Sequence, residues 1–347
     1  MQLQTRCQLL ADKATGEKLK VGIIGLGSQT LEYHIPALAK TKSAELTSVC
    51  DVDEAKLQKA RTELGVNTYK DYHELLDSEN IDFIIAATPH HIYPEIIENA
   101  AKRKIHIFKE KPFARNLAEG LRFKRICEEN GVHLTTRVQR RYDPIYNTFF
   151  QLKEQIGDIF FVDAKYTLCV PNPHEGWRAN RDMAGGGCIM DMGYHIIDLI
   201  IWYFGLPDKV HAEFSSKAKE GKNYDAEDTA QVMFRYDRGL NGSLLLSRCY
   251  PPKTEQINVL GNQGIISIEK YAIKTQKSDG TFGDALNRGQ GWSAASVRQL
   301  DDFCKLIRGE GINNSSPDNH LQHLGFLEAC YASKKQGGYV SPKELMM

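Results

Sequence analysis

The sequence lacks the features that mark membrane, exported and nucleic-acid-binding proteins. Basic and acidic residues balance at 44 each in 347 residues, so no net charge favours nucleic acid or an anionic membrane. The longest apolar run, Ile196 to Phe204, is interrupted by Asp198 and is shorter than the roughly 18 residues of a membrane span. The N-terminal segment has scattered charges and lacks the apolar region of a signal peptide. We therefore expect a soluble, cytoplasmic protein with no nucleic-acid or membrane partner.

The cysteines also lack any pattern that would indicate a disulfide framework or a zinc site. There are eight of them, dispersed along the chain, with no CxxC pair and no Cys/His cluster at metal-ligand spacing. In a chain without an export signal, we expect buried free thiols in a reducing compartment. The sequence predicts no metal site.

The length and composition predict two globular domains. A chain of 347 residues is too long for one ordinary core, and 41% hydrophobic with 25% charged residues is typical of a globular protein. We expect an N-terminal arm over residues 1–18, a dinucleotide-binding domain over 19–140, and a substrate-binding and oligomerisation domain over 141–347.

The first predicted domain alternates short apolar runs with amphipathic stretches. The predicted strands are 19–25, 44–51, 67–69, 81–88, 105–109 and 133–139. The predicted helices are 33–40, 53–64 with Asp53 as N-cap, 72–76, 94–102 and 117–130. This alternation indicates right-handed βαβ crossovers and a doubly wound parallel sheet of the Rossmann type.

The second predicted domain consists mainly of strand-like runs. These are 160–170, 210–218, 229–236, 240–247 and 256–260, with hairpin turns at Arg238-Gly239 and Asn262-Gln263-Gly264. Helical patterns are confined to 191–204, 296–307 and 319–335. We predict an α+β domain with a large, mostly antiparallel open sheet, giving an α/β protein overall.

A glycine turn follows the first predicted strand. Gly25 permits a tight turn, and Gly27 lets backbone N–H groups approach a pyrophosphate at a helix N-terminus. Thr30 stands at the third position of this fingerprint, where glycine or alanine is usual, so helix and strand are expected to pack slightly farther apart. Asp51 ends the second strand, where a carboxylate bonds a ribose 2′-hydroxyl and repels a 2′-phosphate. The pattern favours NAD over NADP, the alternative being a structural βαβ unit.

Polar residues follow two further strands of the predicted parallel sheet. Thr88-Pro89 and Glu110-Lys111-Pro112 come at carboxyl ends of strands, where doubly wound sheets bind ligands. Spacing alone leaves Lys111 open between a functional group and a solvated partner of Glu110.

A triple glycine precedes a predicted helix that carries Asp191, His195 and Asp198 on one face, at i, i+4 and i+7. The glycines let the chain pass close to other backbone or to a ligand. Read alone, the polar face is either catalytic or a buried structural face with satisfied hydrogen bonds. A metal site is disfavoured because no second histidine lies at ligand spacing. His174, in the preceding loop, is either a substrate contact or an exposed loop histidine.

Together these motifs resemble the glucose–fructose oxidoreductase/inositol dehydrogenase (Gfo/Idh/MocA) family. The residues that carry the resemblance are Gly25-Leu-Gly27, Asp51, Thr88-Pro89, Glu110-Lys111-Pro112 and Gly185-Gly-Gly-Cys-Ile-Met-Asp191-Met-Gly-Tyr-His195-Ile-Ile-Asp198. The resemblance implies catalytic roles for Lys111, Asp191 and His195. It implies a cofactor site of Gly25, Gly27, Ser28, Gln29, Asp51, Thr88, Pro89, Glu110 and Lys111. It implies that His174, Trp177, Arg178, Asp191 and His195 line the substrate side.

These groups suit oxidation of a carbinol. A histidine titrates near neutral pH and accepts the hydroxyl proton, while the Lys111 ammonium stabilises developing alkoxide charge and Asp191 orients a neighbour. We expect an NAD-dependent oxidoreductase of a sugar, cyclitol or related polyol that forms a homodimer or homotetramer. The alternatives are an imine or dihydrodiol reductase and a dinucleotide-sensing regulator without catalysis.

Overall fold

The computed structural model describes residues 17–287 and 292–347, which divide into two compact units. Unit 1 runs to Ala114 and includes Ala118–Gln139 and Trp292–His320. Unit 2 contains Arg115–Leu117, the described chain from Arg140 to Asn287, and Leu321–Met347. Of the predicted N-terminal arm, only Glu17 and Lys18 lie within the described residues. In this described part of the chain, no helix is both long and apolar enough to cross a membrane.

Unit 1 is a six-stranded, fully parallel sheet, as the sequence predicts, and its strands lie in the order β3-β2-β1-β4-β5-β6. Its strands are β1 (Leu19–Ile24), β2 (Ala44–Cys50), β3 (Asn67–Tyr69), β4 (Phe83–Ala86), β5 (His106–Lys109) and β6 (Leu134–Thr136). Its helices are the π-helical turn η1 (Thr30–His34), α2 (Ile35–Leu38), α3 (Glu54–Leu64), α4 (Tyr72–Ser78), the 3-10 turn η2 (His90–Ile92), α5 (Tyr93–Lys102), α6 (Leu117–Asn130) and α12 (Trp292–Ile307). Asp53 caps α3 by accepting from Ala55 N and Lys56 N, which confirms the predicted helix start.

Alternate residues of β1 point to opposite faces of this sheet. Val21 and Ile23 are fully buried in a core with α2, α3 and α12, to which α12 contributes Leu300 and Phe303. This packing places residues 292–320 in unit 1, whereas the predicted boundary at 140 placed them in the second domain. The boundary could not follow from chain order, because α12 returns to a sheet completed more than a hundred residues earlier.

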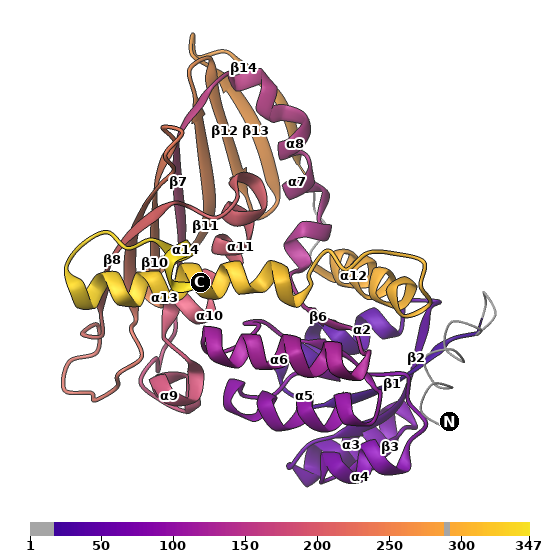
Figure 1. Cartoon of the computed structure of the whole chain (residues 1–347). Helices are drawn as coiled ribbons and strands as arrows, with labels where there is room; N and C mark the ends of the chain where they lie inside the picture. The colour runs from indigo at the N-terminus through magenta and orange to yellow at the C-terminus, as the bar shows by residue number, and fades with distance from the viewer. Residues whose placement is uncertain (1–16, 288–291) are drawn as a thin grey trace. The chain divides into compact units, whose positions relative to one another are not determined.

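Unit 2 is an eight-stranded sheet in the order β14-β13-β12-β11-β7-β10-β9-β8. All neighbouring pairs are antiparallel except β7 with β10, which confirms the predicted mostly antiparallel sheet. The strands are β7 (Ile159–Cys169), β8 (Lys209–Ser215), β9 (Thr229–Arg235), β10 (Asn241–Ser247), β11 (Cys249–Gly261), β12 (Gly264–Glu269), β13 (Ala272–Lys277) and β14 (Phe282–Asn287). Figure 1 shows β12 and β13 running beside one another in this sheet.

One face of this sheet is buried and carries the short helices that lead to the predicted catalytic segment. On β10, Leu244 and Leu246 are fully buried, and the Leu246 side chain packs so closely on Gly193 that a Cβ there would meet it at 2.5 Å. The helices with residues in this unit are α7 (Pro144–Asn147), α8 (Phe149–Leu152), α9 (Arg181–Ala184), α10 (Cys188–Asp191), α11 (Gly193–Phe204), α13 (Pro317–Gln336) and α14 (Pro342–Leu345). Three 3-10 turns, η3 (Gln139–Tyr142), η4 (Lys153–Ile156) and η5 (Trp177–Ala179), complete the described elements.

Three features of the structure differ from the sequence-based expectations. The strands β12, β13 and β14 were not predicted, and β13 and β14 have edge-type sequences with little apolar alternation. The predicted helix 191–204 is two helices, α10 and α11, that join at Met192. The seven described cysteines are free thiols, as predicted, but Cys169 is exposed and Cys249 is half-buried.

Candidate active site

The predicted phosphate turn is a tight strand-to-helix connection. Gly25 has φ +98°, and a Cβ built on it would lie 2.4 Å from Ala87 O, so no other residue fits there. Gly27 has nothing within 4 Å of its Cβ position and precedes the helical residues Ser28 and Gln29. The first N–H groups of a helix have no intrahelical partner, so this turn offers donors in front of open space.

Thr30 holds the turn through its hydroxyl group. Its Oγ1 donates to Gly25 O at 2.6 Å, and the residue is fully buried at the start of the π-helical turn η1. The sequence predicted that threonine at this position would only space helix and strand apart. Its hydroxyl instead ties the first helical turn to the glycine that makes the bend.

Asp51 lies beside the same turn, at the end of β2. Its Oδ2 accepts from Leu26 N at 2.6 Å, and its Oδ1 accepts from Asp53 N at 2.9 Å. A carboxylate has about four lone-pair sites, so two remain for a further donor such as a ribose hydroxyl. The Nζ of Lys56, on α3, lies 3.7 Å from Asp51 Oδ2. The residues next to Asp51 along the chain do not indicate this cation.

The Glu110-Lys111-Pro112 segment follows the carboxyl end of β5, and the side chain of Lys109 donates hydrogen bonds to its backbone. The Lys109 Nζ is fully buried, donates to Glu110 O at 2.7 Å and to Pro112 O, and lies 3.8 Å from the centre of the Tyr93 ring. Burial lowers the pKa of Lys109 to about 7. The Lys111–Pro112 peptide is cis, and Lys111 itself is half-buried.

Glu110 belongs to a buried polar cluster. Its Oε1 accepts from Arg137 Nη1 at 3.0 Å and lies 2.8 Å from His34 Nε2, and Arg137 Nη1 also donates to Gln29 Oε1 at 3.3 Å. Burial alone would raise the pKa of Glu110, but Arg137 and His34 outweigh it and hold the pKa well below its usual range. Glu110 is therefore ionised and fixed to the helix that follows the glycine turn.

Two buried polar atoms at the ends of β4 and β5 have no hydrogen-bond partner among the described residues. They are Thr88 Oγ1 and Glu110 Oε2. Buried polar atoms are nearly always paired in proteins, so these two oxygens can form a hydrogen bond with a bound molecule. With the open space at Gly27 and the carboxylate of Asp51, they fit a dinucleotide along the carboxyl edge of this sheet.

In unit 2, the triple glycine brings the chain against the loop that precedes β9. A Cβ on Gly187 would lie 2.0 Å from Glu227 O, and Glu227 Oε1 accepts from Gly187 N and Ile189 N at 2.8 and 3.1 Å. The predicted close approach to other backbone is confirmed. The contact fixes the start of α10 and therefore the position of Asp191 at its end.

Asp191 lines a cavity of about 250 Å³ within unit 2. The predicted substrate residues Trp177 and Arg178 also line it, and Arg178 Nε lies 3.4 Å from Asp191 Oδ2. The other lining residues are Leu168, Val170, Asn172, Pro173, Glu175, Gly176, Met192 and Arg248. The cavity is of the size of a monosaccharide, and its lining is mainly apolar with charged side chains among the apolar ones.

The two predicted histidines of this region do not line that cavity. His174 is largely buried rather than exposed, its Nε2 lies 3.5 Å from Glu175 Oε1, and its Nδ1 has no partner among the described residues. His195 sits in the first turn of α11 and is half-buried, and its N–H donates to Met192 O at 3.3 Å.

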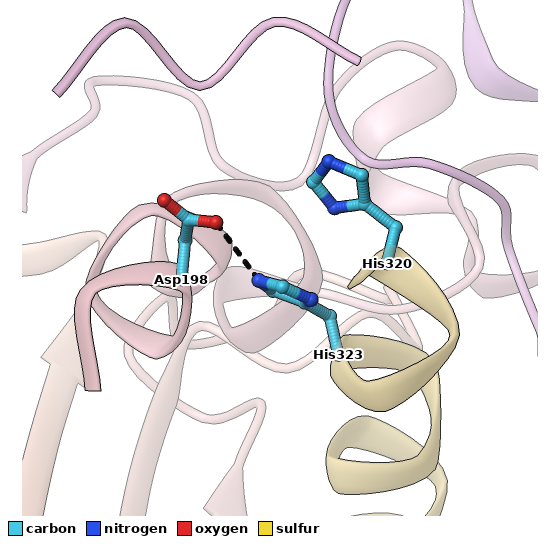
Figure 2. Close-up of side chains that lie close together, drawn as sticks. All are labelled: Asp198, His320 and His323. Carbon is cyan, nitrogen blue, oxygen red and sulfur yellow. Dashed lines mark hydrogen bonds and ion pairs between the residues drawn. The ribbon is translucent and has the colours of Figure 1, made fainter. Parts of the chain in front are cut away.

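Asp198 serves the structure of unit 2 rather than a reaction. Its two carboxylate oxygens accept from Arg141 Nη2 and Nε at 2.7 and 3.0 Å, and Figure 2 shows it facing His323 of α13, whose Nε2 lies 2.9 Å from Oδ1. His320, also drawn in Figure 2, shares a hydrogen bond of 2.7 Å with Ser315 Oγ. Burial would raise the pKa of Asp198, but Arg141 and His323 hold it well below its usual range. For Asp198, the predicted alternative of a satisfied buried polar face is confirmed.

Comparison with known proteins identifies the family. Residues 19–138 match the model of an oxidoreductase family with an NAD-binding Rossmann fold, and residues 152–267 match the C-terminal domain of the same family. The myo-inositol 2-dehydrogenase of Thermotoga maritima is 30% identical over 337 residues, which cover 91% of this chain and 96% of that protein. The chain belongs to the Gfo/Idh/MocA family. It is therefore an oxidoreductase whose relatives act on CH–OH groups of sugars and cyclitols.

Other similarities agree with this family. The scyllo-inositol 2-dehydrogenase (NADP(+)) of Bacillus subtilis is 28% identical, covering 95% of this chain and 90% of that protein. A levoglucosan dehydrogenase, solved with NADH and levoglucosan, has the same fold with a TM-score of 0.84 at 22% identity, covering 94% of this chain and 99% of that one.

In this Gfo/Idh/MocA protein, sequence reasoning missed two charged residues. Lys56 could have been found, because it lies three residues after the helix cap Asp53 and so faces the end of β2. Arg248 lies just beyond β10, and its approach to Asp191 depends on the packing of α10 on β9 and β10, which no local pattern indicates.

Proposed function

We propose that this chain is an NAD-dependent dehydrogenase that moves a hydride between NAD and a carbinol or ketone carbon of a sugar, cyclitol or related polyol. The observation that carries the proposal is the cavity around Asp191, which combines an apolar lining with charged side chains, in a chain that also has a glycine turn suited to a dinucleotide. The named relatives, which oxidise inositols and other sugars, support the same substrate class.

The residues proposed to hold NAD all belong to unit 1. The N–H groups after Gly27, those of Ser28 and Gln29, take the pyrophosphate, and Asp51 takes the adenosine ribose. Thr88, Pro89 and Glu110 follow β4 and β5 and offer the two unpartnered oxygen atoms. NAD is preferred because Asp51 places a negative charge where NADP carries its phosphate, and Lys56 offsets only part of that charge.

Three residues are proposed to act on the substrate. Bound NAD supplies the hydride acceptor. His195 accepts the hydroxyl proton as the carbinol becomes a carbonyl, and returns it in the reverse direction. Lys111 donates to the same oxygen and stabilises its developing negative charge, while Asp191 orients the reacting group. Trp177, Arg178 and His174 are proposed to contact the rest of the substrate.

The assembly and location of the protein are also proposals. An open antiparallel sheet must have its outer face either solvated or covered, and the outer face here exposes Met233 and Ile265 among polar residues. We infer a homodimer or homotetramer that packs through unit 2, in the cytoplasm. Sedimentation of the purified protein tests the oligomer.

The test of the function is turnover of a polyol panel by matched variants. Purified protein receives NAD with myo-inositol, scyllo-inositol, D-xylose or D-glucose, and NADH fluorescence is followed. Lys111→Ala should lower kcat/KM by about 100- to 1000-fold, since it removes the stabiliser of the alkoxide. His195→Asn should lower it by a similar factor of about 100 or more. Lys102→Ala, a surface lysine paired with Glu98, should leave it unchanged.

Each contrary result has a distinct meaning. Full turnover by Lys111→Ala would contradict the proposed chemistry. NAD binding without turnover of any polyol, keto sugar or amino sugar would point to the non-catalytic sensor. Turnover of imines alone would point to the reductase alternative.

A further inference from the structure

Arg248 is a buried arginine on the wall of the cavity around Asp191. It lies between β10 and β11, its backbone N–H donates to Asp228 O, and its side chain is 5% exposed. Burial of a guanidinium costs free energy unless its N–H groups are hydrogen-bonded, so any N–H group without a protein partner indicates where a ligand could bind.

Only one nitrogen of this guanidinium has a hydrogen bond. Nη1 donates to Arg178 O at 3.2 Å, while Nε and Nη2 have no hydrogen-bond partner among the described residues. The nearest carboxylate oxygen to Nη2, Asp191 Oδ2, lies 3.9 Å away, within ion-pair range but beyond a hydrogen bond. The unpaired nitrogens are the two that form one straight edge of the guanidinium plane.

Two other buried arginines of the same unit show what this edge binds. Arg140 donates from Nε and Nη2 to the two oxygens of Glu255, at 2.5 and 2.7 Å. Arg141 donates from the same two nitrogens to Asp198, at 3.0 and 2.7 Å. In both cases the edge takes a carboxylate side-on, which is the strongest geometry of this group.

The two acidic residues next to Arg248 in space do not bond its Nε and Nη2 edge. Glu227 accepts from two backbone N–H groups and lies within reach of the Tyr331 hydroxyl, and burial raises its pKa. Asp228 Oδ2 accepts from Ala218 N and the Tyr224 hydroxyl, while its Oδ1 is buried and has no hydrogen-bond partner among the described residues. Neither carboxyl makes a hydrogen bond to Nε or Nη2 of Arg248, so both nitrogens still lack an acceptor.

The four charged side chains that line the cavity sum to zero, because Arg178 and Arg248 are positive and Asp191 and Glu175 are negative. Arg178 and Glu175 are 52% and 62% exposed, so water screens both of them. Arg248 and Asp191 are only 5% and 22% exposed. These two charges therefore dominate the field that a molecule in the cavity meets.

We propose that Arg248 determines specificity by binding a carboxylate of the substrate through its Nε and Nη2 edge. The substrate class is then a sugar acid or polyhydroxy acid, and the reacting carbinol lies on the same molecule. This inference rests on the proposed function for the reaction, but the binding step that it describes can be measured without turnover. Hydroxyl groups of a neutral polyol also accept hydrogen bonds, but they bind a guanidinium less strongly than a carboxylate does.

The test compares acids with their neutral counterparts in matched variants. The pairs are D-glucuronate with D-glucose and D-galacturonate with D-galactose, and glucose 6-phosphate separates phosphate from carboxylate. The wild type should prefer each acid in kcat/KM. Arg248→Gln should lower that preference by about 10- to 100-fold, the loss expected for hydrogen bonds to a charged group. Arg248→Lys should restore part of the preference, because it keeps the charge and loses the fork.

Arg235→Gln is the matched control, since Arg235 is an exposed arginine of the same sheet, on β9. It should leave the acid preference unchanged. Circular dichroism of each variant checks that unit 2 remains folded.

Binding is measured separately by calorimetry with D-glucuronate and the NADH-loaded protein. Loss of glucuronate binding in Arg248→Gln, with or without turnover, supports the inference. Three results would overturn it: equal use of acids and neutral sugars by the wild type, an equal loss for both in Arg248→Gln, or a preference for glucose 6-phosphate. Absence of NAD reduction with every compound would instead remove the proposed function, while the calorimetric result would still decide the role of Arg248.

Discussion

Replacement of Arg137 by methionine should destabilise unit 1 by a large and specific amount. Arg137 is almost fully buried, and its guanidinium donates to Glu110, to Gln29 Oε1 and to Ser296 Oγ, the last at 2.9 Å. Methionine fills a similar volume without a charge. It would leave the Glu110 carboxylate, also buried, with His34 as its nearest partner.

The expected cost follows from the imbalance that remains. Removal of one partner of a buried ion pair costs about 3–5 kcal/mol, because the other charge stays buried. With a urea dependence of roughly 2 kcal/mol per molar, the unfolding midpoint should fall by about 1.5–2.5 M. Burial also lowers the pKa of His34, so at neutral pH its ring supplies no charge to replace the arginine.

The assay is urea unfolding, followed by hydrogen exchange of the β4 and β5 amides so that unit 1 is observed by itself. The double variant Glu110→Gln/Arg137→Met removes both charges. It should be more stable than the sum of the two single variants predicts, by about 1–3 kcal/mol. Additive effects, or a loss below about 1 kcal/mol in Arg137→Met, would refute the interpretation of this cluster as a coupled buried pair.

Three other predictions concern the cofactor side of unit 1. Gly25→Ala should prevent correct folding of the turn. Gly27→Ala should melt at the temperature of the wild type but bind NAD at least about 10-fold more weakly, as measured by calorimetry. Normal NAD affinity in Gly27→Ala would contradict the phosphate site. Asp51→Ser should improve NADP use relative to NAD by about 10- to 100-fold in kcat/KM, since it removes the repelling charge beside Lys56, and an unchanged ratio would remove Asp51 from the cofactor site. Burial lowers the pKa of Lys109 from 10.5 to about 7. Between these two pH values the Lys109 side chain is protonated in the unfolded chain and neutral in the folded chain. The free energy of unfolding should therefore rise with pH from about 7 to about 10.5 and fall as the pH drops toward 7. In Lys109→Met this rise of the melting temperature should flatten, and an equally steep rise would place its origin elsewhere.

The parts of the fold that local patterns determine could be predicted from the sequence. The strand that ends in Gly25, the cap at Asp53 and the alternation of strands and helices each depend on residues a few positions apart, and the structure has them in place. The residues that require distant strands to pair could not be found this way. Arg248 approaches Asp191 because α10 packs on β9 and β10, and α12 joins unit 1 because its apolar face meets the core around Val21.

Among the polar residues, the sequence could indicate candidates for a catalytic role. It could not indicate which of these side chains have their hydrogen bonds satisfied by other residues of the fold. Asp191 and Asp198 have the same residue type and helical spacing. The structure binds Asp198 between Arg141 and His323, while Asp191 lies on a cavity wall within ion-pair range of Arg178. Thr30 likewise departs from the glycine fingerprint in the sequence. Only the structure shows that its hydroxyl donates a hydrogen bond to Gly25 O and stabilises the turn.

We propose above all that this protein transfers a hydride directly between a carbinol carbon and NAD. The most direct measurement incubates the protein with NAD and a polyol deuterated at its carbinol carbons, and then examines the reduced cofactor by mass spectrometry. We predict that deuterium appears in the nicotinamide ring of the reduced cofactor, and that Lys111→Ala slows its appearance by about 100- to 1000-fold. Formation of the oxidised product with all deuterium released to water, or tight NAD binding with no labelled cofactor from any sugar, cyclitol or sugar acid, would contradict the account.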